Sequence, residues 1–245
     1  MKTIFHDSQL RGFANHGWLQ SYHSFSFAQY YDSNKMNFGA LRVLNDDTVS
    51  GGMGFSKHPH HNMEIISLPL EGALKHGDNM GNSGIIQSGD IQVMSAGKGI
   101  VHSEQNADLH QEVKFLQIWI YPNKNNVEPR YDQYHYAKEN IKNNFQLLLS
   151  PDQKNQGVWI HQEAWLYRAE FDAEHQQNYA LKSNKNGVYI FVLKGKIKIE
   201  NQILQSRDAL GIWETQNFSI EAIDNSEFII IEIPMDIPNL ANQEN

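Results

Sequence analysis

Most of the chain consists of short segments of apolar residues, several alternating with polar ones, separated by clusters of turn-forming residues. Such segments are typical of β-strands, and alternation with period two indicates a strand with one buried face. Strands are predicted at residues 22–27, 38–44, 63–70, 85–91, 113–121, 145–149, 164–171, 187–193, 196–199, 209–213 and 228–233. Turns are expected at 45–47 (NDD), at Glu71-Gly72 and at 78–84. Because no persuasive long amphipathic helix interrupts the first half, the pattern predicts an all-β fold.

The two halves of the chain share one short segment of similar sequence. Residues 86–91 (IQSGDI) resemble residues 204–209 (LQSRDA), and each segment follows a strand that ends in glycine, Gly72 or Gly195. We therefore expect two similar β-barrels. The first would span residues 1–122 and the second 145–240. The polar stretch 123–144 is interpreted as a linker with one short helix within 131–141.

Candidate metal ligands occur in the first half alone. His58 and His60 are two residues apart, and so are His102 and Glu104. Residues i and i+2 of a strand point to the same face, so two adjacent strands would bring three imidazoles and a carboxylate together. This donor set suits Fe, Ni, Cu, Mn or Zn. Glu64 lies an even number of residues after His58 and His60, so a continuous strand would place it on the same face, where it competes with Glu104 as the carboxylate ligand.

Composition excludes several kinds of site and partner. The chain of 245 residues contains no cysteine, which rules out disulfides, thiolate metal sites and cysteine nucleophiles. Its net charge of −8 opposes nucleic-acid and anionic-lipid binding. No apolar run approaches the roughly 20 residues of a membrane helix, so a cytoplasmic protein without membrane contact is expected. The other histidines, His76 among them, are interpreted as surface or hydrogen-bonded residues, whereas His23 is placed among aromatic residues that suit a cavity wall.

Two glycine-bounded motifs carry a family resemblance. Gly52-x5-His58-x-His60-x3-Glu64-x7-Gly72 resembles the first cupin motif. The segment from Gly89 through Ser95-Ala96-Gly97 to His102 resembles the second, with Ser95 where proline is usual and two extra residues before the histidine. The strings HPHHNMEI, MSAGKGIVHSE and HGWLQSYHSFSFAQYYD are similar to those of the pirin family, in particular its bacterial branch of quercetinase-like proteins.

This resemblance implies a bicupin: two stacked double-stranded β-helix (jelly-roll) barrels with few short helices, and metal only in the N-terminal barrel. The family's ligands match His58, His60, His102 and Glu104, which moves Glu64 to a supporting position. Fe(II) is the expected metal, with Ni, Mn, Cu, Co or Zn as alternatives.

The implied activity is that of a quercetin 2,3-dioxygenase, which opens a flavonol with O2 and releases CO and a depside. Glu104 would act as general base. We nominate Phe25, Phe27, Met53 and Phe55 as substrate-binding residues near the barrel mouth. The alternative is a non-catalytic, metal- or redox-sensing pirin that regulates a partner enzyme or a transcription factor. A monomer is expected.

Overall fold

The computed structural model describes residues 1–237, and strands dominate this part of the chain. The first barrel contains β2 (Gly12–Asn15), β3 (Leu19–His23), β4 (Leu41–Val49), β5 (Gly54–His60), β6 (Glu64–Glu71), β7 (Ala73–Asp78), β8 (Ser83–Gln87), β9 (Asp90–Ser95), β10 (Ile100–Asn106), β11 (Val113–Ile120) and β12 (Arg130–His135). The second barrel contains β1 (Lys2–His6), β13 (Gln146–Ser150), β14 (Val158–Trp159), β15 (Trp165–Phe171), β16 (Gln176–Ala180), β17 (Asn186–Lys194), β18 (Lys196–Ile199), β19 (Gln202–Gln205), β20 (Ala209–Trp213), β21 (Asn217–Ala222) and β22 (Ser226–Pro234). Two short 3₁₀ helices complete the described elements, η1 (Ser8–Leu10) and η2 (Lys138–Ile141). No helix within residues 1–237 is long and apolar enough to cross a membrane.

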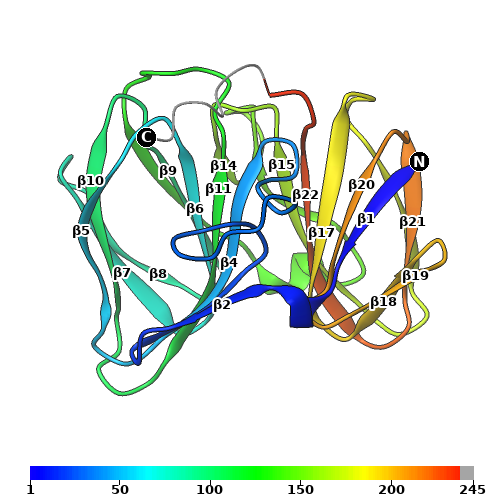
Figure 1. The fold of residues 1–245 in the computed structure, drawn as a ribbon, viewed down its shortest axis with the longest axis horizontal. Coiled ribbons are helices and arrows are strands. Elements are labelled where there is room, and N and C mark those ends of the chain that lie inside the picture. The colour runs from blue at the N-terminus through cyan, green and yellow to red at the C-terminus, as the bar shows by residue number, and fades with distance from the viewer. Residues whose placement is uncertain (238–245) are drawn as a thin grey trace.

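Each barrel is built from a seven-stranded and a four-stranded sheet. In the first barrel the strand orders are β12-β9-β6-β11-β4-β3-β2 and β5-β10-β7-β8. In the second they are β1-β20-β17-β22-β15-β13-β14 and β16-β21-β18-β19. The two larger sheets face each other across the middle of the molecule, and the smaller sheets lie on the outside (Figure 1).

The barrels differ in what fills them. A large apolar cluster, including Leu44, Ile118 and Ile231, packs the two seven-stranded sheets together. A second cluster, including Val188 and Ile220, fills the interior of the second barrel. The first barrel has only two smaller clusters in its interior. Polar side chains, such as those of Asn45, Asp47 and Glu104, occupy other interior positions of this barrel and line a cavity there.

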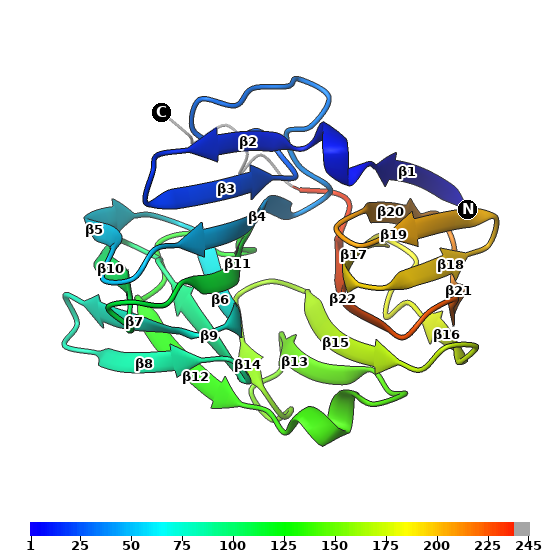
Figure 2. The same cartoon turned by 90° about the horizontal axis from the view of Figure 1, so that it is seen from below.

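The structure differs from the predicted boundaries at both ends of the first barrel. β1 pairs with β20 of the second barrel, so residues within the predicted unit 1–122 cross to the other one (Figure 2). The predicted linker 123–144 contains β12, which pairs with β9 of the first barrel, and only η2 represents the predicted helix. β12 is a half-buried edge strand, which explains its polar, linker-like sequence. Residues 238–240 of the predicted second unit lie outside the described residues.

The turn predicted at residues 45–47 is also wrong. β4 runs unbroken through these residues and pairs with both β3 and β11. Asn45 and Asp47 were interpreted as turn formers, but both side chains are buried inside the barrel. Tertiary contacts have overridden the local preference of Asn and Asp for turns.

Candidate metal centre

Two neighbouring strands bring the predicted ligands together. β5 and β10 are antiparallel, and their register sets His58 opposite His102. His60 lies two residues beyond His58 and therefore shares its face. A register shift between His102 and Glu104 places Glu104 opposite Phe55. The i, i+2 spacing thus puts all four side chains on the inner face of the sheet.

The three imidazoles converge closely. Ring centroids are 4.5 Å apart for His58 and His102, 4.8 Å for His58 and His60, and 4.9 Å for His60 and His102. His58 Nδ1 lies 2.7 Å from the carbonyl oxygen of Ser56, which can only accept a hydrogen bond. His58 Nδ1 therefore carries the hydrogen, and its Nε2 keeps a lone pair for a metal.

His102 provides a direct test of whether a metal fits. Its side chain is buried, and neither ring nitrogen has a hydrogen-bond partner. Burying an unpaired polar group is unfavourable, so such a group points to a missing partner. Burial and the neighbouring histidines hold the pKa of His102 at about 2, and burial holds the pKa of His60 at about 4. Both rings are therefore neutral at pH 7, which is the form that binds metals.

Glu104 lies two residues after His102 on β10 and lines the same cavity. It is buried, and the Ser67 hydroxyl donates a hydrogen bond of 2.6 Å to its Oε1. Burial raises the pKa of Glu104 to about 7, an effect that the Ser67 hydrogen bond partly offsets. Two donor sets, each with atoms within 4.8 Å of one another, meet at His102: one with His58 and His60, the other with His76 and Glu104.

Glu64, the competing carboxylate, lies elsewhere. The Ser95 hydroxyl donates to Glu64 Oε2 at 2.6 Å, and the positive charge of Arg130 acts on the same carboxyl. Burial is the main cause that raises the pKa of Glu64 to about 7. It does not belong to either donor set. The structure therefore separates Glu64 from the cluster.

A cavity opens beside the imidazoles. His58, His60, His102 and Glu104 all line it, together with the aromatic residues Phe27, Phe55 and Trp119. The Trp119 ring packs edge-on against His60 at 5.0 Å and against Phe27 at 5.4 Å. Trp119 Nε1 is a buried donor without a hydrogen-bond partner. The cavity is therefore flanked by flat apolar surfaces suited to an aromatic ligand.

The structure brings only two of the four nominated substrate residues to this cavity, Phe27 and Phe55. Phe25 is 1% exposed in the core between the barrels, where its ring lies 5.4 Å from that of Tyr189. Met53 is 43% exposed and does not line the cavity. β3 ends at His23 and residues 24 and 25 form a bend, so the same-face rule for residues two apart in a strand does not apply to Phe25 and Phe27.

Sequence reasoning missed three residues of the polar wall of the cavity, Ser21, Asn45 and Asp47, which lie beside the predicted His23. Asp47 accepts a short hydrogen bond from the Ser21 hydroxyl, and His23 Nδ1 lies 2.9 Å from Asn45 Oδ1. Burial raises the pKa of Asp47 to about 7. Asn45 and Asp47 are two residues apart, so a continuous strand places both side chains on one face, and this spacing was a signal that both could lie inside. His23 is in the position its aromatic neighbours suggested.

Comparisons with known proteins match nearly the whole chain. A family model described as Pirin matches residues 5–120, and one described as Quercetinase C-terminal cupin domain matches residues 147–233. A protein of Escherichia coli named quercetin 2,3-dioxygenase is 43% identical over 224 residues, covering 91% of this chain and 95% of the relative. A pirin-like protein of Caulobacter vibrioides is 37% identical over 222 residues, covering 90% and 95%.

Solved structures agree with these matches. The crystal structure of YhhW from Escherichia coli has a TM-score of 0.91 and 40% identity, covering 97% of this chain and all of that one. A complex of the bacterial pirin YhhW with nickel(II) has a TM-score of 0.90 and 41% identity, covering 95% and 99%. The predicted bicupin fold is confirmed, and the relatives support the prediction of an oxidoreductase.

Proposed function

Because the chain belongs to the pirin family, we propose that it is a metal-dependent dioxygenase that cleaves a flavonol such as quercetin. His58, His60, His102 and Glu104 are the proposed ligands, and Fe(II) is the proposed native metal. The observation that carries this proposal is the buried His102 ring, unpartnered at both nitrogens, beside an aromatic-lined cavity. A regulatory pirin would not need such a cavity.

A bound divalent metal would act as a Lewis acid and lower the pKa of a flavonol 3-hydroxyl. Glu104 is the proposed acceptor of that proton, because its carboxyl lines the cavity beside His102 and Ser67 holds it in place. The Ser67 hydroxyl fixes the Glu104 carboxyl through Oε1. In the overall reaction both atoms of O2 enter the depside, and one ring carbon leaves as CO.

The cavity walls orient the substrate. Phe27, Phe55 and Trp119 provide flat apolar contacts that exclude water from the reacting ring. The Trp119 Nε1–H group and the wall with Asp47 offer hydrogen-bonding groups to substrate oxygens. A planar, polyhydroxylated aromatic molecule matches both surfaces.

The test combines metal analysis with turnover on one preparation. Chain purified without added metal is analysed for transition metals, reconstituted with Fe(II), and assayed under air for loss of the quercetin absorbance band and for CO release. We expect about one metal per chain and metal-dependent turnover. His58→Ala should lose the metal held by the three histidines and with it turnover, whereas the exposed neighbour variant His61→Ala should behave as the parent. Metal binding without turnover would instead support the regulatory alternative.

A further inference from the structure

The strand next to β10 carries a second histidine–acid pair. In the β7–β10 ladder, His76 lies opposite Glu104 and Asp78 lies opposite His102. Directly opposed residues of antiparallel strands have Cβ atoms about 4.5–5.5 Å apart on one face. Of the two predicted roles for His76, a surface or a hydrogen-bonded residue, the structure shows the second: its side chain is 1% exposed inside the barrel and pairs with Asp78.

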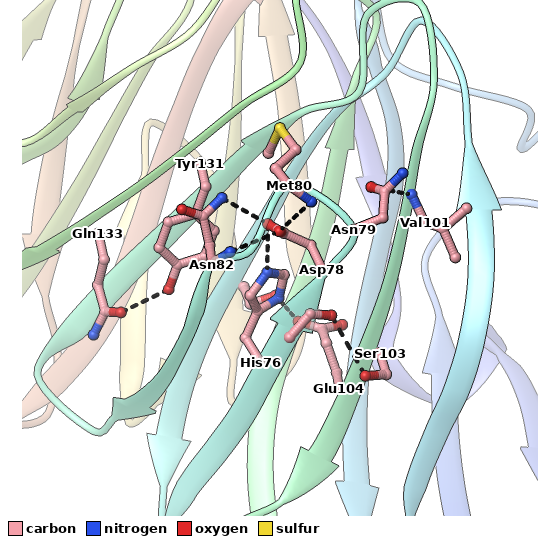
Figure 3. A network of polar contacts seen from close by, with 12 residues as sticks. His76, Asp78, Asn79, Met80, Asn82, Val101, Ser103, Glu104, Tyr131 and Gln133 are labelled. Atoms are coloured by element: carbon pink, nitrogen blue, oxygen red, sulfur yellow. Dashed lines mark hydrogen bonds and ion pairs between the residues drawn. The ribbon is translucent and has the colours of Figure 1, made fainter.

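Asp78 fixes the orientation of the His76 ring, as Figure 3 shows. Asp78 Oδ1 accepts from the backbone N–H groups of Met80 at 2.9 Å and Asn82 at 3.0 Å. Asp78 Oδ2 accepts from Asn82 Nδ2 at 2.9 Å and lies 3.2 Å from His76 Nε2. Because the Asp78 oxygens act as acceptors, His76 Nε2 donates the hydrogen. His76 Nδ1 is then left with a lone pair.

That lone pair has no partner of its own. His76 Nδ1 is buried without a hydrogen bond. The ring stacks on Tyr131 at 4.7 Å, with an angle of 29° between the planes, which restricts its movement. One donor atom each from His76, His102 and Glu104 lies within 4.8 Å of the others.

We propose that His76, His102 and Glu104 form a second position for a divalent cation beside the three-histidine set, with Asp78 as the residue that orients His76. Two imidazoles and one carboxylate are the donors of the facial triad that binds Fe(II) in non-haem oxygenases. A metal-binding histidine usually donates its other N–H group to a carboxylate, as His76 does to Asp78.

The two positions share His102 and, with the ligands proposed above, Glu104. A neutral imidazole has one lone pair, so His102 serves one ion at a time. We therefore expect one ion per chain, shared between the two positions. His76 does not line the cavity, whereas His58 and His60 do, so an ion held by His76 lies on the side of His102 and Glu104 nearer to β7. This inference rests on the metal centre of the proposed function but not on its substrate.

The test measures metal binding to the full-length chain without any substrate. The chain is stripped of metal and titrated with Co(II), whose visible spectrum reports its coordination. Pulsed EPR of the Cu(II) form then counts the bound imidazoles. His76→Phe keeps a flat ring against Tyr131 but removes both nitrogens. Asp78→Asn keeps the shape and removes the carboxylate. The matched control is His135→Phe, which breaks an exposed histidine–carboxylate pair with Asp90.

We expect His76→Phe to remove the second position, which changes the Co(II) spectrum and the imidazole count while the three-histidine position still binds Co(II). Asp78→Asn should weaken binding at the second position about 10- to 100-fold and change the spectrum in the same direction, and His135→Phe should have no effect. If His76→Phe fails to fold, as judged by circular dichroism, Asp78→Asn decides the matter. Unchanged affinity and spectra would overturn the second position, and so would weaker binding with an unchanged imidazole count. Absence of flavonol turnover in a parent that shows the His76 effect would count against the proposed substrate alone.

Discussion

The buried His6 side chain should make the stability of the protein depend on pH below neutrality. His6 is the last residue of β1, the strand that crosses to the second barrel. Its Nδ1 lies 2.8 Å from the Tyr189 hydroxyl, and its ring packs against Phe25. Burial, with a smaller contribution from the charge of Lys35, lowers the pKa of His6 from 6.5 to about 4, although Asp32 opposes the shift.

The sign and size of the effect follow from these two pKa values. The unfolded chain takes up the His6 proton below pH 6.5, whereas the folded chain resists it until about pH 4. The contribution of His6 to the free energy of unfolding is therefore most favourable above pH 6.5, and it falls as the pH falls towards 4. A shift of this size corresponds to a loss of about 2 kcal/mol between pH 7.5 and pH 5, and about 3 kcal/mol below pH 4.

The assay compares the parent with His6→Gln, which lacks the titrating group. Urea unfolding is followed at pH 7.5 and pH 5 with a chelator present, so that loss of metal does not contribute. Other titrating groups, such as Glu64 and Asp47, are common to both chains and cancel in the difference. The parent should lose about 2 kcal/mol more than the variant between the two pH values. Equal losses in the two chains would refute the assignment to His6.

Four further outcomes follow from the structure. Glu104→Gln should weaken metal binding and abolish flavonol turnover with the fold intact, whereas Glu64→Gln should keep its metal; metal analysis showing the reverse would exchange their roles. Phe25→Ala should lose about 3–5 kcal/mol of stability in urea unfolding because it empties part of the core between the barrels, with KM unchanged in the surviving folded protein. Phe27→Ala should instead raise KM about tenfold, as expected for loss of roughly 1.4 kcal/mol of apolar contact; an unchanged KM would remove Phe27 from the substrate site. Metal at 100 times its Kd should stabilise the chain by about 2.7 kcal/mol because it binds the folded state through His102, and a melting temperature that does not respond to metal or chelator would contradict this.

Local pattern was enough to predict about half of the strands, mainly those with apolar sequences. Residues 63–70, 164–171 and 228–233 were predicted as strands, and the structure has β6, β15 and β22 there. These segments are rich in β-branched and aromatic residues, so their local preference and their burial agree. The wrong predictions lie where the local preference of the residues and their burial disagree. In β4 and β12 the polar residues favour turns or solvent, and pairing with neighbouring strands decides the conformation.

The cluster of possible ligands was also contained in the sequence. A two-residue spacing in a strand fixes the face of each side chain, so His58 with His60, and His102 with Glu104, had to point the same way. What the spacing did not contain was the register between strands. Register places Asp78 beside His102 and His76 beside Glu104, and it brings these residues together although their sequence separation is 24 and 28.

Sequence by itself therefore determined the fold class, the barrel that holds the site and the parity of its candidate ligands, because these depend on periodicity within single strands. Only the tertiary structure decided which of Phe25 and Phe27 faces the cavity, that Glu64 lies apart from His102, and that His76 joins the cluster. These outcomes depend on twist, register and contact between strands far apart in the chain, and no local pattern encodes them.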